Sequence, residues 1–330
     1  MKSRLMKSFL ASAAFLAASA GVASAADAVK FMIDWLPAGD KAAIYYGVEK
    51  GIFAEADLDV TVLVGRGSSD VVTKLSTGAA DVGSGGLSAL LQAVATEKAP
   101  AKAVLSVYTK QPDAIFTTTD SGIEKLADVS GKKIATATFS SSNVVWPLVL
   151  EANGIDPASV EVVKVDPGAL APMLATGQVA ATINWMTVAP AFAGPLGEAG
   201  KTFKSLPWSE YGFDGYGLSI FASDTMIKDR PEVLKRFVVA YQKASSMAIE
   251  DAEGAAAALK AMVPEIDEAT AVNQWKASIP LMVNDISEKN GEGTFEPEFL
   301  KATWGWVAKS QGMELDALDP ETIVDRSFAE

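Results

Sequence analysis

The sequence predicts an α/β fold of two doubly wound lobes joined by a hinge, with a cleft between them. Two observations support this prediction. Short apolar runs alternate with amphipathic stretches from residue 29 to residue 185, a pattern typical of mainly parallel sheets covered by helices on both faces. The strand–helix cycle also restarts near residue 114, and a further strand returns near residue 216. The chain is therefore expected to cross from one lobe to the other and back.

The first cycle supplies the elements of one lobe. Its expected strands are Val29–Ile33, Leu58–Val64, Ala80–Gly83 and Ala103–Tyr108. Its expected helices are Lys41–Lys50, Ser69–Ser76 and Leu87–Glu97. Gly51 and Gly78 come just after the first two helices, where glycine commonly ends a helix.

The second cycle supplies the other lobe. Its expected strands are Ala114–Thr118, Lys133–Thr136, Val160–Val165 and Ala181–Trp185, with helical segments Ile123–Leu126, Val144–Asn153 and Leu170–Ala175. The strand Tyr216–Ala222 then returns to the first lobe, and the helices Pro231–Glu250, Ala255–Met262, Glu268–Ile279 and Pro297–Ser310 follow. We therefore expect a signal peptide at 1–25, a first lobe at 26–112 and 213–330 with the C-terminal helices, and a second lobe at 113–212.

The first 25 residues have the three parts of a secretory signal peptide. A basic head, Lys2–Lys7, precedes the apolar run Phe9–Val22, and Ala23–Ala25 provides the small-x-small pattern for cleavage. The apolar run is about 14 residues, shorter than the ~20 that a membrane-spanning helix needs, which disfavours the alternative of an uncleaved anchor. The sequence thus predicts export to the periplasm.

The residue types that are missing exclude several kinds of chemistry. The chain has no cysteine, which removes disulfides, thiolate catalysis, cysteine-ligated zinc and a lipid-bearing cysteine. It has no histidine, the commonest general base and metal ligand. The leader carries three of the 28 basic residues, which leaves 25 against 41 acidic residues, a formal charge of −16. Such a balance repels nucleic acid and anionic lipid, so neither is an expected partner.

A series of short motifs resembles a known family. In chain order the motifs are Asp34–Pro37, Tyr45–Gly47, Lys50–Phe53, Leu58–Val60, Ala79–Gly83 preceded by Gly78, Leu126–Ile134, Gly154–Ile155, Gly177–Ala181 and Asp229–Phe237. Together they resemble the nitrate/sulfonate/taurine and thiamine-precursor family of ABC solute-binding proteins over nearly all of the chain after the leader. The resemblance implies a periplasmic binding protein type II-like fold, a monomer without cofactor or metal, capture of a small-molecule solute, and the transmembrane subunits of an ABC permease as partners.

Within that family, the Asp-Trp-x-Pro motif looks most like members that bind the pyrimidine precursor of thiamine. This chain departs from their pattern at Ala38 and Lys41, where those members usually have Asn and His, and at Ala180, where the family has Asp. A small anion such as an alkanesulfonate, taurine or nitrate is the alternative ligand. An enzyme is the alternative of a different class, but eukaryotic relatives that make the pyrimidine use an active-site histidine and a cysteine cluster, and this chain has neither residue.

Ligands of open α/β sheets bind at the carboxyl ends of strands near topological switch points. On this rule the expected ligand-binding residues are Asp34, Trp35, Asp40, Ser68, Ser84, Gly85, Ser140, Ser141, Asn143, Asn184, Trp185, Asp214 and Tyr216. Trp35 and Trp185 follow strands of different lobes, so each can stack on a flat ligand or face a cation, unless it belongs to the core of its lobe.

The polar candidates each have a structural alternative. Asp34 and Asp40 can accept hydrogen bonds from a ligand amine, although Asp40 is also placed to cap a helix. Lys41 either contacts a ligand anion or points to solvent. The serine-rich segments at Ser68 and at 140–143 open helices, where they either bind an anion or only cap. The aromatic segment 211–216 is expected to be a hinge that also lines the cleft, or else a simple turn.

Overall fold

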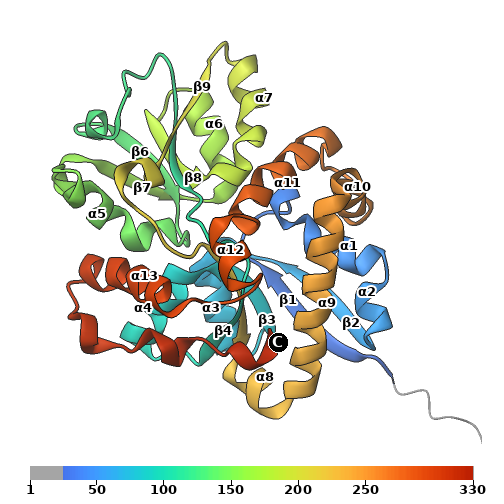
Figure 1. Cartoon of the computed structure of the whole chain (residues 1–330). Coiled ribbons are helices and arrows are strands. Elements are labelled where there is room, and N and C mark those ends of the chain that lie inside the picture. The colour runs from blue at the N-terminus through green and yellow to red at the C-terminus, as the bar shows by residue number, and fades with distance from the viewer. Residues whose placement is uncertain (1–24, 330) are drawn as a thin grey trace, which may run out of the picture.

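The computed structural model describes residues 25–329 and contains two five-stranded sheets (Figure 1). The first sheet has the order β2-β1-β3-β10-β4 and the second the order β7-β6-β8-β5-β9. The strands of the first are β1 (Asp27–Ile33), β2 (Leu58–Val64), β3 (Val82–Gly86), β4 (Ala101–Ser106) and β10 (Leu218–Ser223). Those of the second are β5 (Asp113–Thr118), β6 (Lys133–Ala137), β7 (Glu161–Val165), β8 (Ala181–Trp185) and β9 (Phe203–Pro207). The predicted signal peptide, apart from Ala25, lies outside the described residues.

Each sheet contains one strand that runs against its neighbours, and this strand is the one that arrives from the other sheet. β5 is antiparallel to β8 and β9, and β10 is antiparallel to β3 and β4. The other strands of each sheet end at the edge that faces the opposite sheet. A strand that enters from that edge must therefore run the other way. The crossing segments, 107–112 and 208–217, join the sheets at this edge.

Helices cover both faces of each sheet. Their bounds are α1 (Ala42–Glu49), α2 (Ile52–Glu55), α3 (Ser68–Ser76), α4 (Leu87–Glu97), α5 (Ser142–Ala152), α6 (Leu170–Ala175), α7 (Pro190–Glu198), α8 (Asp224–Asp229), α9 (Pro231–Glu250), α10 (Ala252–Met262), α11 (Glu268–Met282), α12 (Asp285–Asn290) and α13 (Pro297–Ser310). In β1, Phe31 packs on the α9 side against Phe237, whereas Met32 faces the opposite side with Val71 of α3. This alternation is the side-chain period of a strand.

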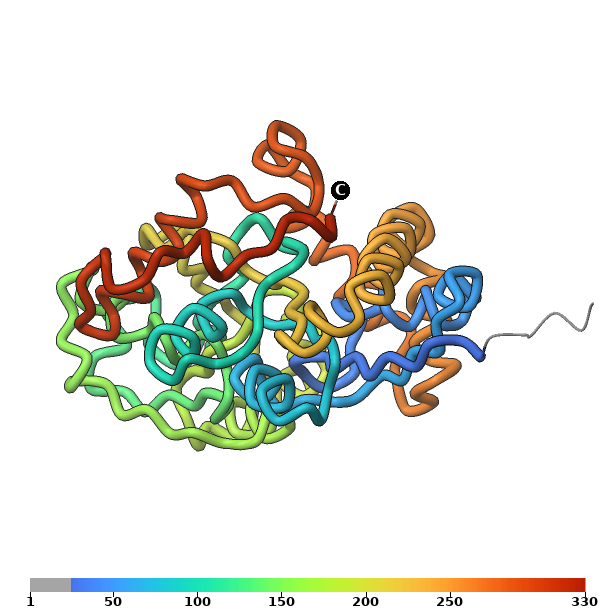
Figure 2. Tube along the Cα trace, turned by 90° about the horizontal axis from the view of Figure 1, so that it is seen from below, coloured from blue at the N-terminus to red at the C-terminus, as the bar shows by residue number. Residues whose placement is uncertain are grey.

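The C-terminal segment contacts both lobes. Ser310 at the end of α13 donates a hydrogen bond to the carbonyl of Val144 in α5 (2.6 Å), and Trp306 packs edge-on against Phe213 at 5.0 Å. Figures 1 and 2 both show the red C-terminal segment beside the green α5. The second crossing and α13 therefore form one packed region, and the lobe boundaries given above remain a prediction.

The sequence did not predict β9, α7 or the short helices α2, α8 and α12. β9 ends in Pro207, which is tolerated because β9 is an edge strand. α7 contains Gly194 and Pro195, which weaken a helical pattern, yet Phe192 anchors it against Phe116 of β5. β3 begins two residues and ends three residues later than predicted because its three glycines hide the apolar pattern. Within 25–329, no helix is both long and apolar enough to cross a membrane.

Candidate ligand site

A small enclosed cavity lies between the two sheets, at the edge where the strands end. Its lining residues are Asp34, Trp35, Asp40, Lys41 and Ser68 from the first sheet's side and Ser140, Ser141, Asn184, Trp185 and Val188 from the second. All except Lys41 and Val188 are among the residues expected from the sequence. The cavity has a volume of about 20 Å³.

Each wall contains residues that lie at the end of a strand or shortly after it. Asp34 and Trp35 follow β1, and Ser68 opens α3 after β2. On the opposite wall, Asn184 and Trp185 end β8. The two walls meet because the carboxyl ends of these strands point toward the same space between the sheets, as the switch-point rule predicts.

Two buried carboxylates share one buried ammonium group on the first wall. Lys41 Nζ lies 2.9 Å from Asp34 Oδ1 and 3.3 Å from Asp40 Oδ2. Ser68 donates a hydrogen bond to Asp34 (3.2 Å), and Thr187 from the second wall donates one to Asp40 (2.8 Å). Lys41 therefore neither points to solvent nor is free for an anion, the two roles the sequence left open for it.

Burial and charge act in opposite directions on this cluster. Burial alone lowers the pKa of Lys41, but the attraction of Asp34 and Asp40 outweighs it and raises the pKa above its ordinary value. Burial raises the pKa of Asp34, and Lys41 only partly offsets the effect. The lysine therefore stays cationic and acts as the internal counter-ion of the two acids.

Two acceptor atoms of the lining are left without a partner. Asp40 Oδ1 and Asn184 Oδ1 are buried and have no hydrogen-bond partner within the part of the chain that the structure describes. The amide nitrogen of Asn184 is already used, since it donates to Thr182 (2.8 Å). A buried acceptor without a hydrogen-bond partner costs free energy, and a ligand with N–H or O–H groups would supply the missing partner.

The two tryptophans each pack against the opposite lobe. Trp35 follows β1 but contacts the apolar cluster of the second sheet that contains Phe192. Trp185 ends β8 but contacts the cluster of the first sheet, with its ring centre 6.1 Å from that of Tyr108. Lys41 Nζ lies over the Trp185 ring, 4.8 Å from its centre. The indoles thus reach across the cleft and are not confined to the core of their own lobe.

The lobes are closed in this structure. The amide of Ser69 donates to the carbonyl of Phe139 across the cleft (3.1 Å), and a Cβ on Gly86 would lie 2.4 Å from Ser141 Oγ. A cavity of about 20 Å³ holds about one water, so a solute requires the lobes to separate or the side chains to move. An adjoining groove of about 240 Å³, which shares Trp35 and Asn184 with the cavity, offers further room.

Two predicted residues lie near the cavity without lining it. Ser84 is buried on β3, and its hydroxyl has no hydrogen-bond partner among residues 25–329. Gly85 lies against Ser68, since a Cβ placed on it would come within 3.3 Å of the Ser68 Cβ. Because Gly85 has no side chain, Ser68 can approach β3 closely. Its hydroxyl accepts a hydrogen bond from the Gly86 amide (2.9 Å).

Three predicted residues make other contacts. Asn143 accepts from Thr136 (2.8 Å) and donates to the carbonyl of Ala137, so it holds the start of α5 on β6. Asp214 is exposed and accepts from the neighbouring amide. Tyr216 is buried, and its hydroxyl accepts from the Glu296 amide (2.7 Å). These residues have structural roles in this closed form.

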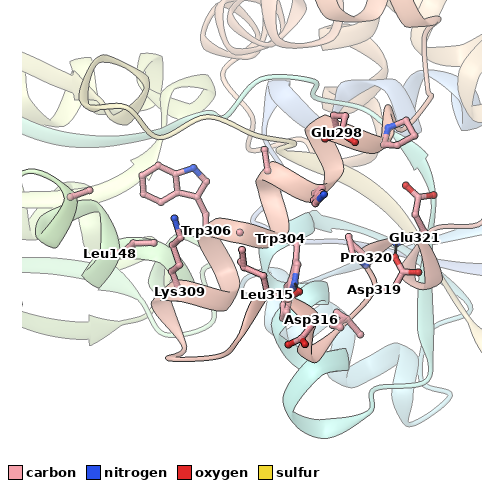
Figure 3. Close-up of a pocket in the computed structure, with 16 residues that line it drawn as sticks. Leu148, Glu298, Trp304, Trp306, Lys309, Leu315, Asp316, Asp319, Pro320 and Glu321 are labelled. Carbon is pink, nitrogen blue, oxygen red and sulfur yellow. Dashed lines mark hydrogen bonds between the residues drawn. The ribbon is translucent and has the colours of Figure 1, made fainter.

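A larger hollow exists elsewhere. A groove of about 920 Å³ runs along α13, and Figure 3 shows Trp306 and Lys309 on the side toward Leu148 of α5 and Asp319, Pro320 and Glu321 on the other. This groove lies away from the strand ends. Its acidic residue Glu321 already forms an ion pair with Arg326 (2.6 Å). The smaller cavity is the better candidate because buried charges and unpaired acceptors converge there.

A family model described as NMT1/THI5 like matches residues 39–255, about two thirds of the chain. The chain belongs to the NMT1/THI5-like family. The matched stretch begins at Gly39, next to Asp40 and Lys41 of the cavity, and includes both crossings between the sheets.

One curated relative of this NMT1/THI5-like chain is a putative thiamine biosynthesis protein of Haemophilus influenzae. The two sequences are 28% identical over 160 residues, which is 48% of this chain and 50% of the relative. The match therefore spans about half the length of that protein.

Solved structures share the fold at low sequence identity. The alkanesulfonate-binding protein SsuA from Xanthomonas axonopodis pv. citri, bound to MOPS, has a TM-score of 0.72 at 16% identity over 91% of this chain and 98% of its own. The ligand-binding component of an ABC-type import system from Staphylococcus aureus, with zinc bound, has a TM-score of 0.69 at 13% identity over 92% and 97%. The NMT1/THI5-like chain thus has the periplasmic binding protein fold that its sequence predicted.

Proposed function

We propose that the protein is the periplasmic solute receptor of an ABC importer and that it captures a small amine-bearing heterocycle, such as the pyrimidine precursor of thiamine. The observation that carries the ligand class is the unpaired, buried Oδ1 of Asp40 at a cavity between Trp35 and Trp185. A flat ring suits the indole faces, and an amine on the ring suits the acid.

The charge balance of the cavity favours a donor over an anion. Asp34 and Asp40 face each other across Lys41, so two acids stand against one base. An anionic ligand would have to compete with both carboxylates for the same ammonium group. A ligand with N–H groups adds partners to Asp40 and Asn184 without breaking the existing pairs.

The transport role is supported by the family and by the fold. The putative thiamine biosynthesis protein among the relatives fits a thiamine precursor as ligand. The periplasmic location is supported by the leader-like first 25 residues, for which N-terminal sequencing of exported protein should begin at Ala26. Retention of these residues would contradict cleavage of the leader, and absence of the protein from the periplasmic fraction would contradict the location.

The ligand can be identified by an experiment that assumes no chemical class in advance. Native mass spectrometry of protein purified without refolding should detect a bound small molecule, and calorimetry with the pyrimidine precursor should give a one-to-one complex. A ligand at 100 times its dissociation constant stabilises the folded state by about 2.7 kcal/mol. Failure of pyrimidines and other heterocyclic amines to bind or stabilise would contradict the proposal.

An alkanesulfonate is the second candidate because Ser140 and Ser141 line the cavity just before α5 begins. Hydroxyls at a helix start suit an anion, and sulfonate-binding proteins share this fold. Binding of taurine or an alkanesulfonate, with no response to pyrimidines, would favour this candidate.

We propose further that the protein does not turn its ligand over. The whole sequence lacks histidine and cysteine, the residues on which the pyrimidine-forming relatives depend. Recovery of chemically unchanged ligand after prolonged incubation is the expected result, and conversion of the ligand would contradict it.

A further inference from the structure

The groove that adjoins the cavity has most of the room that a solute needs. The cavity has a volume of about 20 Å³, enough for about one water, whereas the groove has about 240 Å³. The two spaces share Trp35, Asn184 and Val188 as lining residues. A solute that binds between the tryptophans in this closed arrangement must therefore extend into the groove.

Both lobes contribute to the walls of the groove. The segment after β1 supplies Pro37 and Ala38, α6 and α7 supply Ala171 and Phe192, and α11 supplies Thr270. Most of these side chains are apolar, so the groove suits an organic substituent better than an inorganic ion. Because the walls come from opposite lobes, the groove has its present shape only while the lobes are together.

The charges around the groove disfavour an anion. None of the described residues that line it is basic, and its acidic residue Asp267 already accepts from the Thr270 amide at the start of α11 (2.8 Å). Lys41 of the adjoining cavity is paired with Asp34 and Asp40. Phosphate and sulfonate groups are commonly bound by lysine or arginine. A negatively charged substituent would leave water here without a counter-ion, at a cost in free energy.

Asn184 is the polar group at the junction of the cavity and the groove. It is 3% exposed, and its Oδ1 has no hydrogen-bond partner in the part of the chain that the structure describes. Its amide nitrogen donates to Thr182, which leaves the oxygen for a ligand. A substituent that begins with an N–H or O–H group would supply the missing donor at the point where it leaves the cavity.

We propose that the groove is a second subsite, which takes an uncharged substituent on the ring of the solute, with an N–H or O–H group donated to Asn184. This deepens the proposed function, since it rests on a heterocycle bound between Trp35 and Trp185. A ring without such a substituent is a poorer ligand, and so is a ring with a phosphorylated one. A phosphate ester must therefore be hydrolysed before the receptor can capture the solute.

The test is calorimetry of the purified full chain with three aminopyrimidines that differ in one substituent. The first carries a methyl group and the second a ureidomethyl arm, which is uncharged and begins with an N–H group. The third carries the phosphate ester of a hydroxymethyl arm, which has a similar length but is anionic. We expect the ureidomethyl ring to bind roughly two- to tenfold more tightly than the methyl ring, and the phosphate ester at least about tenfold more weakly than the ureidomethyl ring.

Thr270→Phe fills the groove and keeps the start of α11 intact, because Asp267 accepts from the backbone amide of this residue. It should weaken binding of the ureidomethyl ring about tenfold and leave the methyl ring unaffected. Ala269→Phe is the matched control, since Ala269 is the exposed neighbour on α11 and does not line the groove. Ala171→Phe blocks the groove from α6 if Thr270→Phe folds poorly. Asn184→Leu should remove the preference for the ureidomethyl ring over the methyl ring.

The outcomes separate this proposal from the proposed function. Equal affinity for the methyl and ureidomethyl rings would overturn the subsite and leave the proposed function standing. The same holds for a phosphate ester that binds as tightly as the ureidomethyl ring, and for groove-filling variants that weaken both rings equally. Absence of binding by all three compounds would contradict the subsite and the proposed function together.

Discussion

The ammonium group of Lys41 lies 4.8 Å from the centre of the Trp185 ring, and the two residues belong to opposite walls of the cleft. The same ammonium is paired with Asp34 and Asp40 on its own wall. One buried cation therefore links the carboxylate pair of the first lobe to the aromatic wall of the second, and it does so in a conformation with room for about one water.

Truncation of either cleft tryptophan should weaken ligand binding. Removal of a stacking tryptophan at the centre of a site commonly costs 2 kcal/mol or more, which is about thirtyfold in affinity. Trp35→Ala and Trp185→Ala are expected to show this loss in calorimetry while unfolding cooperatively. Unchanged affinity in both would place the ligand elsewhere.

The matched control for those variants is Trp304→Ala. Trp304 is fully buried on α13, its indole N–H donates to the Leu315 carbonyl (2.8 Å), and it does not line the cavity. Its loss should reduce the free energy of unfolding by about 3–5 kcal/mol. Affinity measured on the protein that remains folded should change little.

Removal of the buried cation should destabilise the protein in a pH-dependent way. Lys41→Met leaves Asp34 and Asp40 buried without a counter-ion, at a cost of about 3–5 kcal/mol near neutral pH. Without the lysine the pKa of Asp34 rises further, because nothing offsets its burial, so protonation at lower pH should restore part of the loss. Denaturant unfolding at several pH values measures this.

Lys243→Met provides the comparison for the lysine variant. Lys243 pairs with Glu55 on the surface, where both side chains are more than half exposed, and such pairs contribute about 0–1 kcal/mol. A loss in Lys41→Met no larger than in Lys243→Met would show that the buried pair does not matter for stability.

Gly86→Ala should hinder closure of the lobes. The backbone of Gly86 is compatible with alanine, but the added Cβ would lie 2.4 Å from Ser141 Oγ. We expect lower ligand affinity and a larger radius of gyration in solution scattering, with recovery in the double variant that also carries Ser141→Gly. Gly194→Ala, where the new Cβ meets nothing within 4 Å, should leave both quantities unchanged.

The raised pKa of Asp113 predicts an unusual pH dependence of stability. An unfolded aspartate titrates near 3.9, whereas Asp113 in the folded protein titrates at about 6. Between these values the folded state binds more protons, so the free energy of unfolding falls as pH rises from about 4 to about 6. The full effect of a shift of about two units is roughly 3 kcal/mol.

The measurement is the difference between the wild-type protein and Asp113→Asn. Asp34, whose pKa is also raised by burial, acts in the same direction in both proteins, so the difference isolates Asp113. The stability difference should change between pH 4 and pH 6 and stay level from there to pH 8. A constant difference throughout would mean that Asp113 does not titrate in this range.

The sequence predicted the fold and the place of the cavity because both follow from chain order. Strand ends can be read from where apolar runs stop, and the switch-point rule then brings Trp35 and Trp185 to one space. The role of Lys41 could not be read in this way. A lysine one residue after Asp40 is usually exposed, and only the tertiary structure shows that Asp34 and Trp185 enclose it.

Sequence spacing also could not show which of the predicted site residues would lie outside the cavity lining. Asn143 and Tyr216 have polar groups that could bind a ligand. In the structure these groups instead accept hydrogen bonds, Asn143 from Thr136 and Tyr216 from the Glu296 amide. A polar residue near a strand end serves the backbone or the ligand, and which of the two depends on side-chain directions that spacing alone does not fix.

The most direct test of the account is calorimetry of the wild-type protein and of Asp40→Asn with the thiamine pyrimidine precursor and, separately, with an alkanesulfonate. We expect the wild type to bind the pyrimidine and not the sulfonate. Asp40→Asn should weaken pyrimidine binding by about ten- to a hundredfold, since a hydrogen bond to a charged group contributes about 1.5–3 kcal/mol. Tight sulfonate binding that Asp40→Asn leaves unchanged, with no pyrimidine binding, would contradict the account.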